Sequence, residues 1–216
     1  MNKKILVDSN SVFSEYIAEI RDEEIQKDPM RFRRNLERIG EIFAYEISKS
    51  LDYEIRSVKT PLGVANENKL KSYPVIATIL RAGLALHQGL MSYFDRSESG
   101  FVSAYRDTAE DGSFDIKVEY LAAPSIENRT VILSDPMLAT GRSMELAYKA
   151  ILKNGTPKCL HVVAALASRQ GVQFIEQNLP DNTTIWLGAV DEELNSKAYI
   201  CPGLGDAGDL AYGNKL

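Results

Sequence analysis

An apolar run, a carboxylate, a turn of small residues and the start of a helical pattern follow one another in Val131-Ile132-Leu133-Ser134-Asp135-Pro136-Met137-Leu138-Ala139-Thr140-Gly141-Arg142-Ser143. The apolar run has the length of a buried strand, and amphipathic spacing over residues 143–153 indicates a helix. Functional sites in open parallel sheets lie beyond the carboxyl ends of strands. We therefore expect a strand, a site-forming loop that begins at Asp135, and a helix.

Short apolar runs recur along the chain, and helical patterns separate several of them. The runs cover residues 75–80, 100–105, 131–133, 160–166 and 184–190, and the helical patterns cover residues 30–50, 84–93, 143–153 and 170–178. Buried strands that alternate with helices predict an α/β fold with a mainly parallel sheet flanked by helices. Because no linker or repeat divides the chain, we expect one domain over residues 1–216.

Two stretches depart from this alternation. Residues 51–58 alternate in the manner of a strand until Pro61 and Gly63 break the pattern, which indicates an edge strand or an arm. Residues 106–128 are rich in Asp, Glu, Gly and Ser, and we expect a flexible loop or hairpin over the site.

Composition excludes several classes of protein. A net charge of -5 argues against an extended nucleic-acid partner, which usually requires a basic surplus. No apolar stretch approaches the ~20 residues of a membrane span, and the N-terminus lacks a secretory signal pattern. Cys159 and Cys201 have no metal-binding or disulfide spacing, so we expect a cytoplasmic protein.

The turn at residues 140–143 has the chemistry of a phosphate site. Thr140 and Ser143 supply hydroxyls, Gly141 allows unusual backbone torsions, and the amides that open the following helix favour an anion. The loop lacks the Gly-Lys-Ser/Thr of a P-loop and the Gly-x-Gly-x-x-Gly of a dinucleotide fold. Read without the rest of the chain, the turn is also compatible with a simple strand end followed by a helix cap.

Four segments resemble motifs of the uracil phosphoribosyltransferases, in that family's order and spacing from about Arg31 to the C-terminus. They are the phosphoribosyl-diphosphate (PRPP) loop at residues 135–143, the diphosphate loop at 74–84, the Tyr-Arg-Asp element at 105–107 and the uracil segment at 199–209. Asp135-Pro136 favours the uracil branch over the purine and orotate enzymes, which often carry two adjacent acids here. One departure is Arg142, which replaces a usual glycine and could strengthen the 5′-phosphate site.

The resemblance implies a type I phosphoribosyltransferase fold with a C-terminal base-binding hood and an N-terminal region of helices and a β-arm. It implies a pentosyltransferase that converts uracil and PRPP to UMP and diphosphate in pyrimidine salvage. Mg²⁺ is the expected cofactor, held through PRPP and water near Asp206 rather than by direct protein ligands. A non-proline cis peptide is expected near Leu80-Arg81-Ala82.

The resemblance also implies residue roles. Asp135, Arg81 and Arg106 are the expected catalytic residues. PRPP binding is expected of Arg81, Arg106, Asp135, Pro136, Met137, Leu138, Ala139, Thr140, Gly141, Arg142, Ser143 and Asp206, and uracil binding is expected of Ile200, Gly205, Asp206 and Ala207. No residue stands out as a general base, and His87 and His161 are expected to be core or surface residues.

Two rival functions remain open beside this one. The first is transfer to another base, and the second is a regulator that binds UMP and RNA, which the net charge of -5 disfavours. Resemblance implies a homodimer or a higher homo-oligomer. Some family members respond to GTP at a separate site, and the sequence does not decide whether this chain does.

Overall fold

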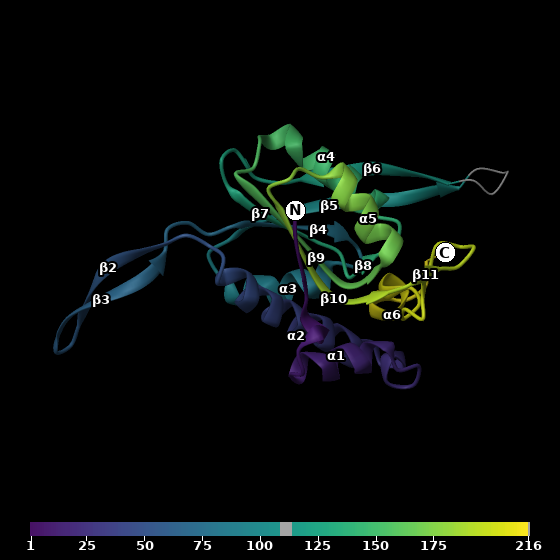
Figure 1. Ribbon diagram of the computed structural model, residues 1–216, viewed down its shortest axis with the longest axis horizontal. Coiled ribbons are helices and arrows are strands. Elements are labelled where there is room, and N and C mark those ends of the chain that lie inside the picture. The colour runs from purple at the N-terminus through teal and green to yellow at the C-terminus, as the bar shows by residue number, and fades with distance from the viewer. Residues whose placement is uncertain (109–113, 216) are drawn as a thin grey trace.

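A mainly parallel sheet of eight strands forms the centre of the molecule (Figure 1). The computed structural model describes residues 1–108 and 114–215, with side chains described outside residues 104–118. The strand order is β1-β10-β9-β7-β4-β5-β6, and β8 also pairs with β9. The strands are β1 (Asn2–Ile5), β4 (Val75–Leu80), β5 (Glu98–Thr108), β6 (Phe114–Ala122), β7 (Thr130–Ser134), β8 (Met137–Leu138), β9 (Cys159–Ser168) and β10 (Thr183–Asp191). All pairs are parallel except β5 with β6.

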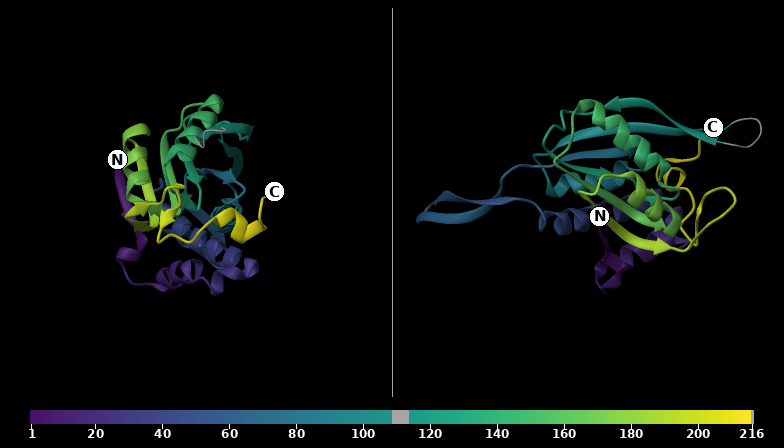
Figure 2. Two further views of the ribbon diagram at one scale, coloured as in Figure 1. Left: turned by 90° about the vertical axis from the view of Figure 1, so that its right-hand side faces the viewer. Right: turned by 45° about the horizontal axis from the view of Figure 1, so that its top comes forward.

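Helices cover both faces of this sheet (Figure 2). One face carries α1 (Val12–Arg21), α2 (Pro29–Ser48), α3 (Leu84–Tyr93) and α6 (Ala207–Tyr212), and the other carries α4 (Arg142–Ile151) and α5 (Arg169–Asn178). Short 3-10 turns occur at Leu6–Asp8, Ile25–Lys27 and Leu152–Asn154. The predicted α/β fold with a mainly parallel sheet is therefore confirmed.

Helix α2 illustrates how the sequence determines these elements. Asp28 caps the helix by accepting hydrogen bonds from the amides of Met30 and Arg31, and Pro29 occupies the first turn, where its missing N–H is harmless. Its buried residues recur at steps of three and four, so one stripe faces the sheet.

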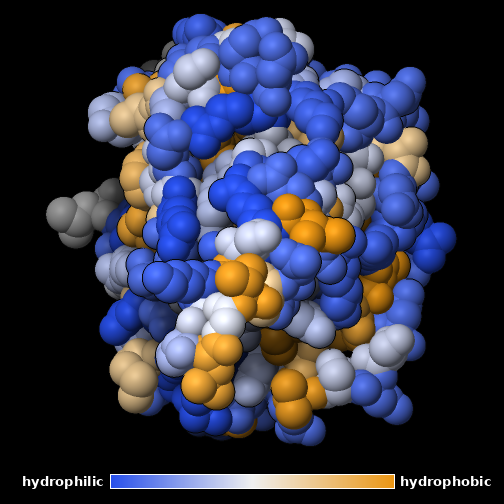
Figure 3. Space-filling model, turned by 90° about the vertical axis from the view of Figure 1, so that its left-hand side faces the viewer, coloured by the Kyte–Doolittle hydropathy of each residue, from blue (hydrophilic) through white to orange (hydrophobic). Residues whose placement is uncertain are grey.

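The β-arm is a separate two-stranded hairpin of β2 (Tyr53–Thr60) and β3 (Gly63–Leu70), which projects away from the sheet (Figure 1). Residues 51–58 predicted its first strand, whereas β3 was not predicted. Ile55, Leu62 and Val64 are large apolar side chains left exposed on this hairpin, and hydrophobic side chains lie among polar ones on the face that bears it (Figure 3).

The polar stretch after β5 returns as β6, so part of residues 106–128 forms the predicted hairpin. Its tip at residues 109–113 lies outside the described residues. Further along the chain, β11 (Glu193–Leu194) and β12 (Ile200–Cys201) form a small antiparallel pair before α6, in the region expected to be a base-binding hood.

Both histidines belong to the core, one of the two places expected for them. The Trp186 indole donates a hydrogen bond to His161 Nδ1 at 3.0 Å, and His87 Nε2 lies 3.1 Å from the Ser99 hydroxyl. Burial lowers the pKa of each histidine to about 4, so both are neutral near pH 7. Cys159 and Cys201 are unpaired thiols. Within the described part of the chain, no helix has the length and apolar character needed to cross a membrane.

Candidate active site

A pocket lies beyond the carboxyl ends of the parallel strands, where a site in such a sheet is expected. Strands β4 and β7 run side by side, with Thr78 opposite Ser134. Their ends are tied together because the Thr78 hydroxyl donates to the Ser134 carbonyl at 3.0 Å and the Ser134 hydroxyl donates to the Ala77 carbonyl at 3.2 Å. Ser134 thus has a structural use at the start of the loop.

The first part of the predicted PRPP loop, residues 135–139, is fastened to β9. The Asp135 amide donates to the Val163 carbonyl at 3.1 Å, and Leu166 donates to the Pro136 carbonyl at 2.9 Å. Strand β8 then pairs with β9, and the Ser168 hydroxyl donates to the Ala139 carbonyl at 2.6 Å. These bonds tie the first part of the loop to the sheet.

Two glycines allow this loop to pack closely against α5. Gly141 has a φ of +79°, and a Cβ there would lie 2.8 Å from Phe174 Cδ1. A Cβ at Gly171 would lie 2.2 Å from the Ala139 carbonyl oxygen. A side chain at either position would displace the loop.

Helix α4 presents its N-terminus to the pocket. Its cap is Gly141, which has no side chain to satisfy the first amides, and Ser143 and Met144 both line the pocket. The positive end of the helix dipole adds to these N–H groups, which makes an anion site. Arg142 is exposed and lines neither this pocket nor the one that adjoins it, so its side chain lies apart from the cradle that its neighbours form.

Asp135 lies in the pocket as a carboxylate that is costly to ionise. Its pKa is raised to about 7, chiefly by burial and to a lesser extent by the nearby Asp206 carboxylate, while the Met137 amide opposes both by donating to Oδ1 at 3.2 Å. A carboxylate in this setting gains most from a ligand that offers hydroxyls or positive charge.

Arg81 and Asp135 both line an adjoining second pocket. The Leu80–Arg81 peptide is cis, as the resemblance implied. Arg81 Nη2 donates to Asp209 Oδ1 at 2.6 Å and Nη1 reaches the Tyr212 carbonyl at 3.4 Å, whereas its buried Nε has no hydrogen-bond partner among the described residues. Arg106 lies on β5, and its side chain is outside the described residues.

The C-terminal segment forms the opposite wall of the first pocket. Ile200, Gly205, Asp206 and Ala207, the four residues expected to bind uracil, all line it. Asp206 also caps α6 by accepting the Asp209 amide at 3.0 Å, and its Oδ2 lies 3.6 Å from Lys215 Nζ. The predicted PRPP loop and the predicted base segment therefore face each other across one pocket.

Some lining residues had no predicted role. Ala82, Met144, Ala198, Tyr199 and Gly208 line the first pocket, and Ile79, Leu80, Ser103 and Lys215 line the second. Five of them lie inside the segments that resemble the diphosphate loop and the uracil segment, although no individual role was predicted for them: Ile79, Leu80, Ala82, Tyr199 and Gly208. Met144 and Ala198 directly adjoin motifs, so their only signal was proximity in sequence. Lys215 had none, because it follows the last motif. Conversely, Pro136 is buried and lines neither of the two pockets.

The donor set in the pocket suits a hard divalent cation. Asp135 and Asp206 both line it, and carboxylate oxygens combined with substrate phosphates are the usual ligands of Mg²⁺. Among the described residues no group of three or more His, Cys, Asp or Glu side chains forms a metal site by itself. A magnesium ion here would therefore need oxygens from its substrate.

Comparison with known proteins gives consistent matches over nearly the whole chain. The sequence model of the family described as uracil phosphoribosyltransferase matches residues 7–214. A Porphyromonas gingivalis protein named uracil phosphoribosyltransferase is 53% identical over 207 residues, which cover 96% of each chain. A Thermococcus gammatolerans protein of the same name is 38% identical, covering 94% of this chain and 89% of the relative. The solved structure of the AQ2163 protein from Aquifex aeolicus is 31% identical and superposes with a TM-score of 0.86 over 98% of both chains.

Proposed function

The chain belongs to the uracil phosphoribosyltransferase family, and we propose that it joins uracil N1 to C1 of PRPP, releasing diphosphate and forming UMP for pyrimidine salvage. This proposal rests on the first pocket, in which an anion site, Asp135 and a glycine-rich C-terminal segment meet. The chain acts in this proposal as one phosphoribosyltransferase domain over residues 1–216.

The 5′-phosphate of PRPP is assigned to the N-terminus of α4. The amides of Ser143 and Met144 would donate to the phosphate oxygens, and Thr140 and Ser143 would add hydroxyls. Arg142 contributes its backbone at this turn, and its exposed side chain is the least supported of the predicted phosphate contacts.

Asp135 would accept hydrogen bonds from the ribose hydroxyls. With a pKa of about 7, Asp135 is only partly ionised near neutral pH in the free protein. Hydrogen bonds from the ribose hydroxyls would favour its charged form on binding. Mg²⁺ would be held by PRPP oxygens and water, with Asp206 contacting it through a bound water. Bound Mg²⁺ would offset the negative charge that develops on the departing diphosphate.

Arg81 and Arg106 would bind the diphosphate. A guanidinium pairs bidentately with phosphate oxygens, and Arg81 has an Nε–H that is unpartnered among the described residues. Its ion pair with Asp209 would then hold the guanidinium in place. Positioning and electrostatic stabilisation of the leaving group would supply most of the rate enhancement, since no residue is assigned as a general base.

Uracil would lie against the C-terminal segment at Ile200, Gly205, Asp206 and Ala207. Main-chain groups there would pair with the donors and acceptors on the edge of the base. Cytosine would present an amino donor where uracil presents an acceptor, and buried groups would be left unpaired. This difference is the expected basis of selectivity.

The test is UMP formation from labelled uracil, PRPP and Mg²⁺, run beside orotate and hypoxanthine and beside filter retention of RNA. Uracil should be consumed with one diphosphate released per UMP. Retention of RNA without UMP formation would support the regulator instead, and turnover of another base would move the chain to a different branch.

We further propose a homodimer or a higher homo-oligomer in which the exposed apolar side chains of the β-arm are covered by a second copy. Mass measurement by light scattering tests this, because a monomeric mass would contradict it. GTP is a candidate effector, to be tested by adding it to the same assay. A cytoplasmic location agrees with the two unpaired cysteines.

A further inference from the structure

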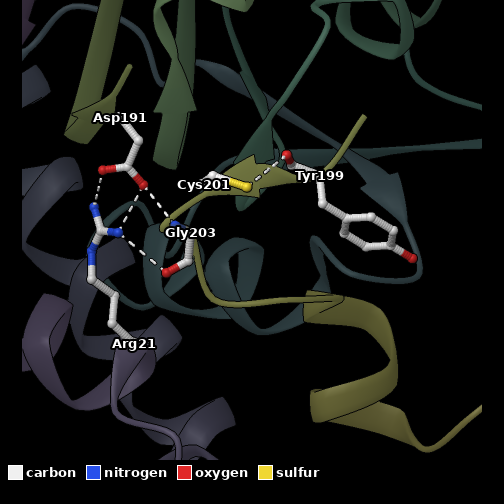
Figure 4. A network of polar contacts seen from close by, with 5 residues as sticks. All are labelled: Arg21, Asp191, Tyr199, Cys201 and Gly203. Carbon is white, nitrogen blue, oxygen red and sulfur yellow. Dashed lines mark hydrogen bonds and ion pairs between the residues drawn. The ribbon is translucent and has the colours of Figure 1, made fainter. Parts of the chain in front are cut away.

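An ion pair outside the pocket holds the loop that forms one of the pocket's walls (Figure 4). Arg21, the last residue of α1, donates from Nη1 and Nη2 to the two carboxylate oxygens of Asp191, both at 2.8 Å. Arg21 Nη1 also donates to the Gly203 carbonyl at 3.2 Å, and the Gly203 amide donates to Asp191 Oδ2 at 2.9 Å. Both backbone groups of Gly203 are thereby bonded to the pair.

The backbone conformation at Gly203 requires a glycine. Its φ is +56°, and a Cβ there would lie 2.1 Å from the Ile200 carbonyl oxygen, so the backbone folds tightly back on the residue expected to contact the base. Gly203 is buried, and Asp191 is 8% exposed. Only two residues separate this glycine from Asp206, which lines the pocket.

The charge balance explains why this carboxylate stays ionised under the loop. Burial would raise the pKa of Asp191, but the hydrogen bonds from Arg21 and Gly203 outweigh burial and hold that pKa below its usual value. A bidentate guanidinium also fixes an orientation that a point charge does not. Figure 4 shows Tyr199 directed away from the pair, so the loop places the pair and a pocket-lining ring on different sides.

We propose that Arg21 and Asp191 are positioning residues for uracil: they clamp Gly203 and so set the loop against which the base is read. This inference rests on the proposed function. We expect the pair to affect uracil binding more than PRPP binding, because residues 135–139 of the PRPP loop are fastened independently to β9.

Arg21→Lys tests the clamp, since lysine keeps the charge but not the fork that reaches both Asp191 and Gly203. We expect the KM for uracil to rise about tenfold, which corresponds to the loss of one hydrogen bond to a charged group. The KM for PRPP should stay within twofold. Asp191→Asn should change the two constants in the same way.

Arg31→Lys is the matched control. Arg31 makes a comparable two-bond pair with Glu19, at 2.8 and 2.6 Å, and among the described residues that pair has no hydrogen bond to residues 199–209. This variant should leave both KM values within twofold of wild type. A uracil KM that is unchanged in Arg21→Lys, or that rises in parallel with the KM for PRPP, would overturn the inference.

Hydrogen exchange provides a second readout that does not depend on turnover. Peptides covering residues 199–209 should exchange faster in Arg21→Lys than in wild type or Arg31→Lys, because the Gly203 amide loses a fixed partner. Unchanged exchange would also overturn the clamp. A wild-type protein that forms no UMP would instead defeat the proposed function, and the exchange result would still report on the loop.

Discussion

The Asp135→Asn substitution distinguishes the effect of this carboxylate on the free energy of unfolding from its effect on UMP formation. Burial raises the pKa of Asp135 from 3.8 to about 7. At about 1.4 kcal/mol per pKa unit, ionising the group in the free folded protein costs at most about 4 kcal/mol more than in the unfolded chain. Because the folded-state pKa is the higher one, this loss of stability develops as pH rises from about 4 and is complete above pH 7.

An asparagine carries no such cost, and it can still accept the Met137 amide. The variant should therefore be more stable than wild type at pH 8, and this advantage should shrink by about 2 to 3 kcal/mol between pH 8 and pH 5. Urea unfolding followed by the single, buried Trp186 measures both curves. UMP formation should meanwhile fall about 100-fold, since an amide replaces the charged acceptor for the ribose hydroxyls.

The control is Asp181→Asn, which removes an exposed carboxylate and should give a curve parallel to wild type. If the wild-type and Asp135→Asn stabilities also ran parallel from pH 5 to pH 8, the argument from burial would be refuted. Near-normal turnover in Asp135→Asn would remove this residue from the reaction.

Three further changes test other parts of the site and the core. Gly141→Ala should lose about 1–2 kcal/mol of stability from its φ of +79° and should raise the KM for PRPP, as measured by urea unfolding and steady-state kinetics. Gly213→Ala, with a φ of +85° and open space around it, is the control that should leave that KM unchanged. Arg81→Ala should lower kcat at least 100-fold with the fold intact by circular dichroism, and a smaller loss would contradict its role at the diphosphate. Burial lowers the pKa of His161 from 6.5 to about 4. The free energy of unfolding should therefore fall by up to about 3 kcal/mol as pH falls through that range, because the unfolded chain binds a proton that the folded protein does not. The two buried histidines should contribute about equally to this loss of unfolding free energy at low pH, so His161→Gln should remove about half of it. An unfolding free energy with the same pH dependence as wild type would contradict this.

The core elements were predictable where burial imposes a spacing on the sequence. The apolar run at residues 75–80 is β4, and the helical pattern at 84–93 is α3, with the expected ends. β4 lies within the sheet and α3 packs on it, so the spacing of their apolar residues follows the geometry of each element directly.

Strands whose side chains are mostly exposed could not be predicted from hydrophobic spacing. β1 has three exposed residues out of four and joins the sheet through its parallel ladder with β10. β3 alternates little because it lies in the projecting arm, with most of its residues exposed. Neither strand has a buried face to impose a hydrophobic pattern.

Some parts of the site were likewise predictable from the sequence and others were not. The loops were recognisable because phosphate binding and a tight base pocket demand particular residues at fixed spacing, as at Asp135 and Gly141. The tie between Arg21 and Asp191 joins residues 170 positions apart, and only the folded chain brings them together. Arg142 shows the reverse case, because a residue within the motif has its side chain directed to solvent.

A crystal structure with UMP bound tests the central claim most directly. The account predicts the nucleotide phosphate within hydrogen-bond distance of the Ser143 and Met144 amides, the ribose hydroxyls on Asp135, and the uracil edge on the main chain between Ile200 and Ala207. A UMP molecule bound elsewhere, or one with its base at the N-terminus of α4 and its phosphate at the C-terminal segment, would contradict it.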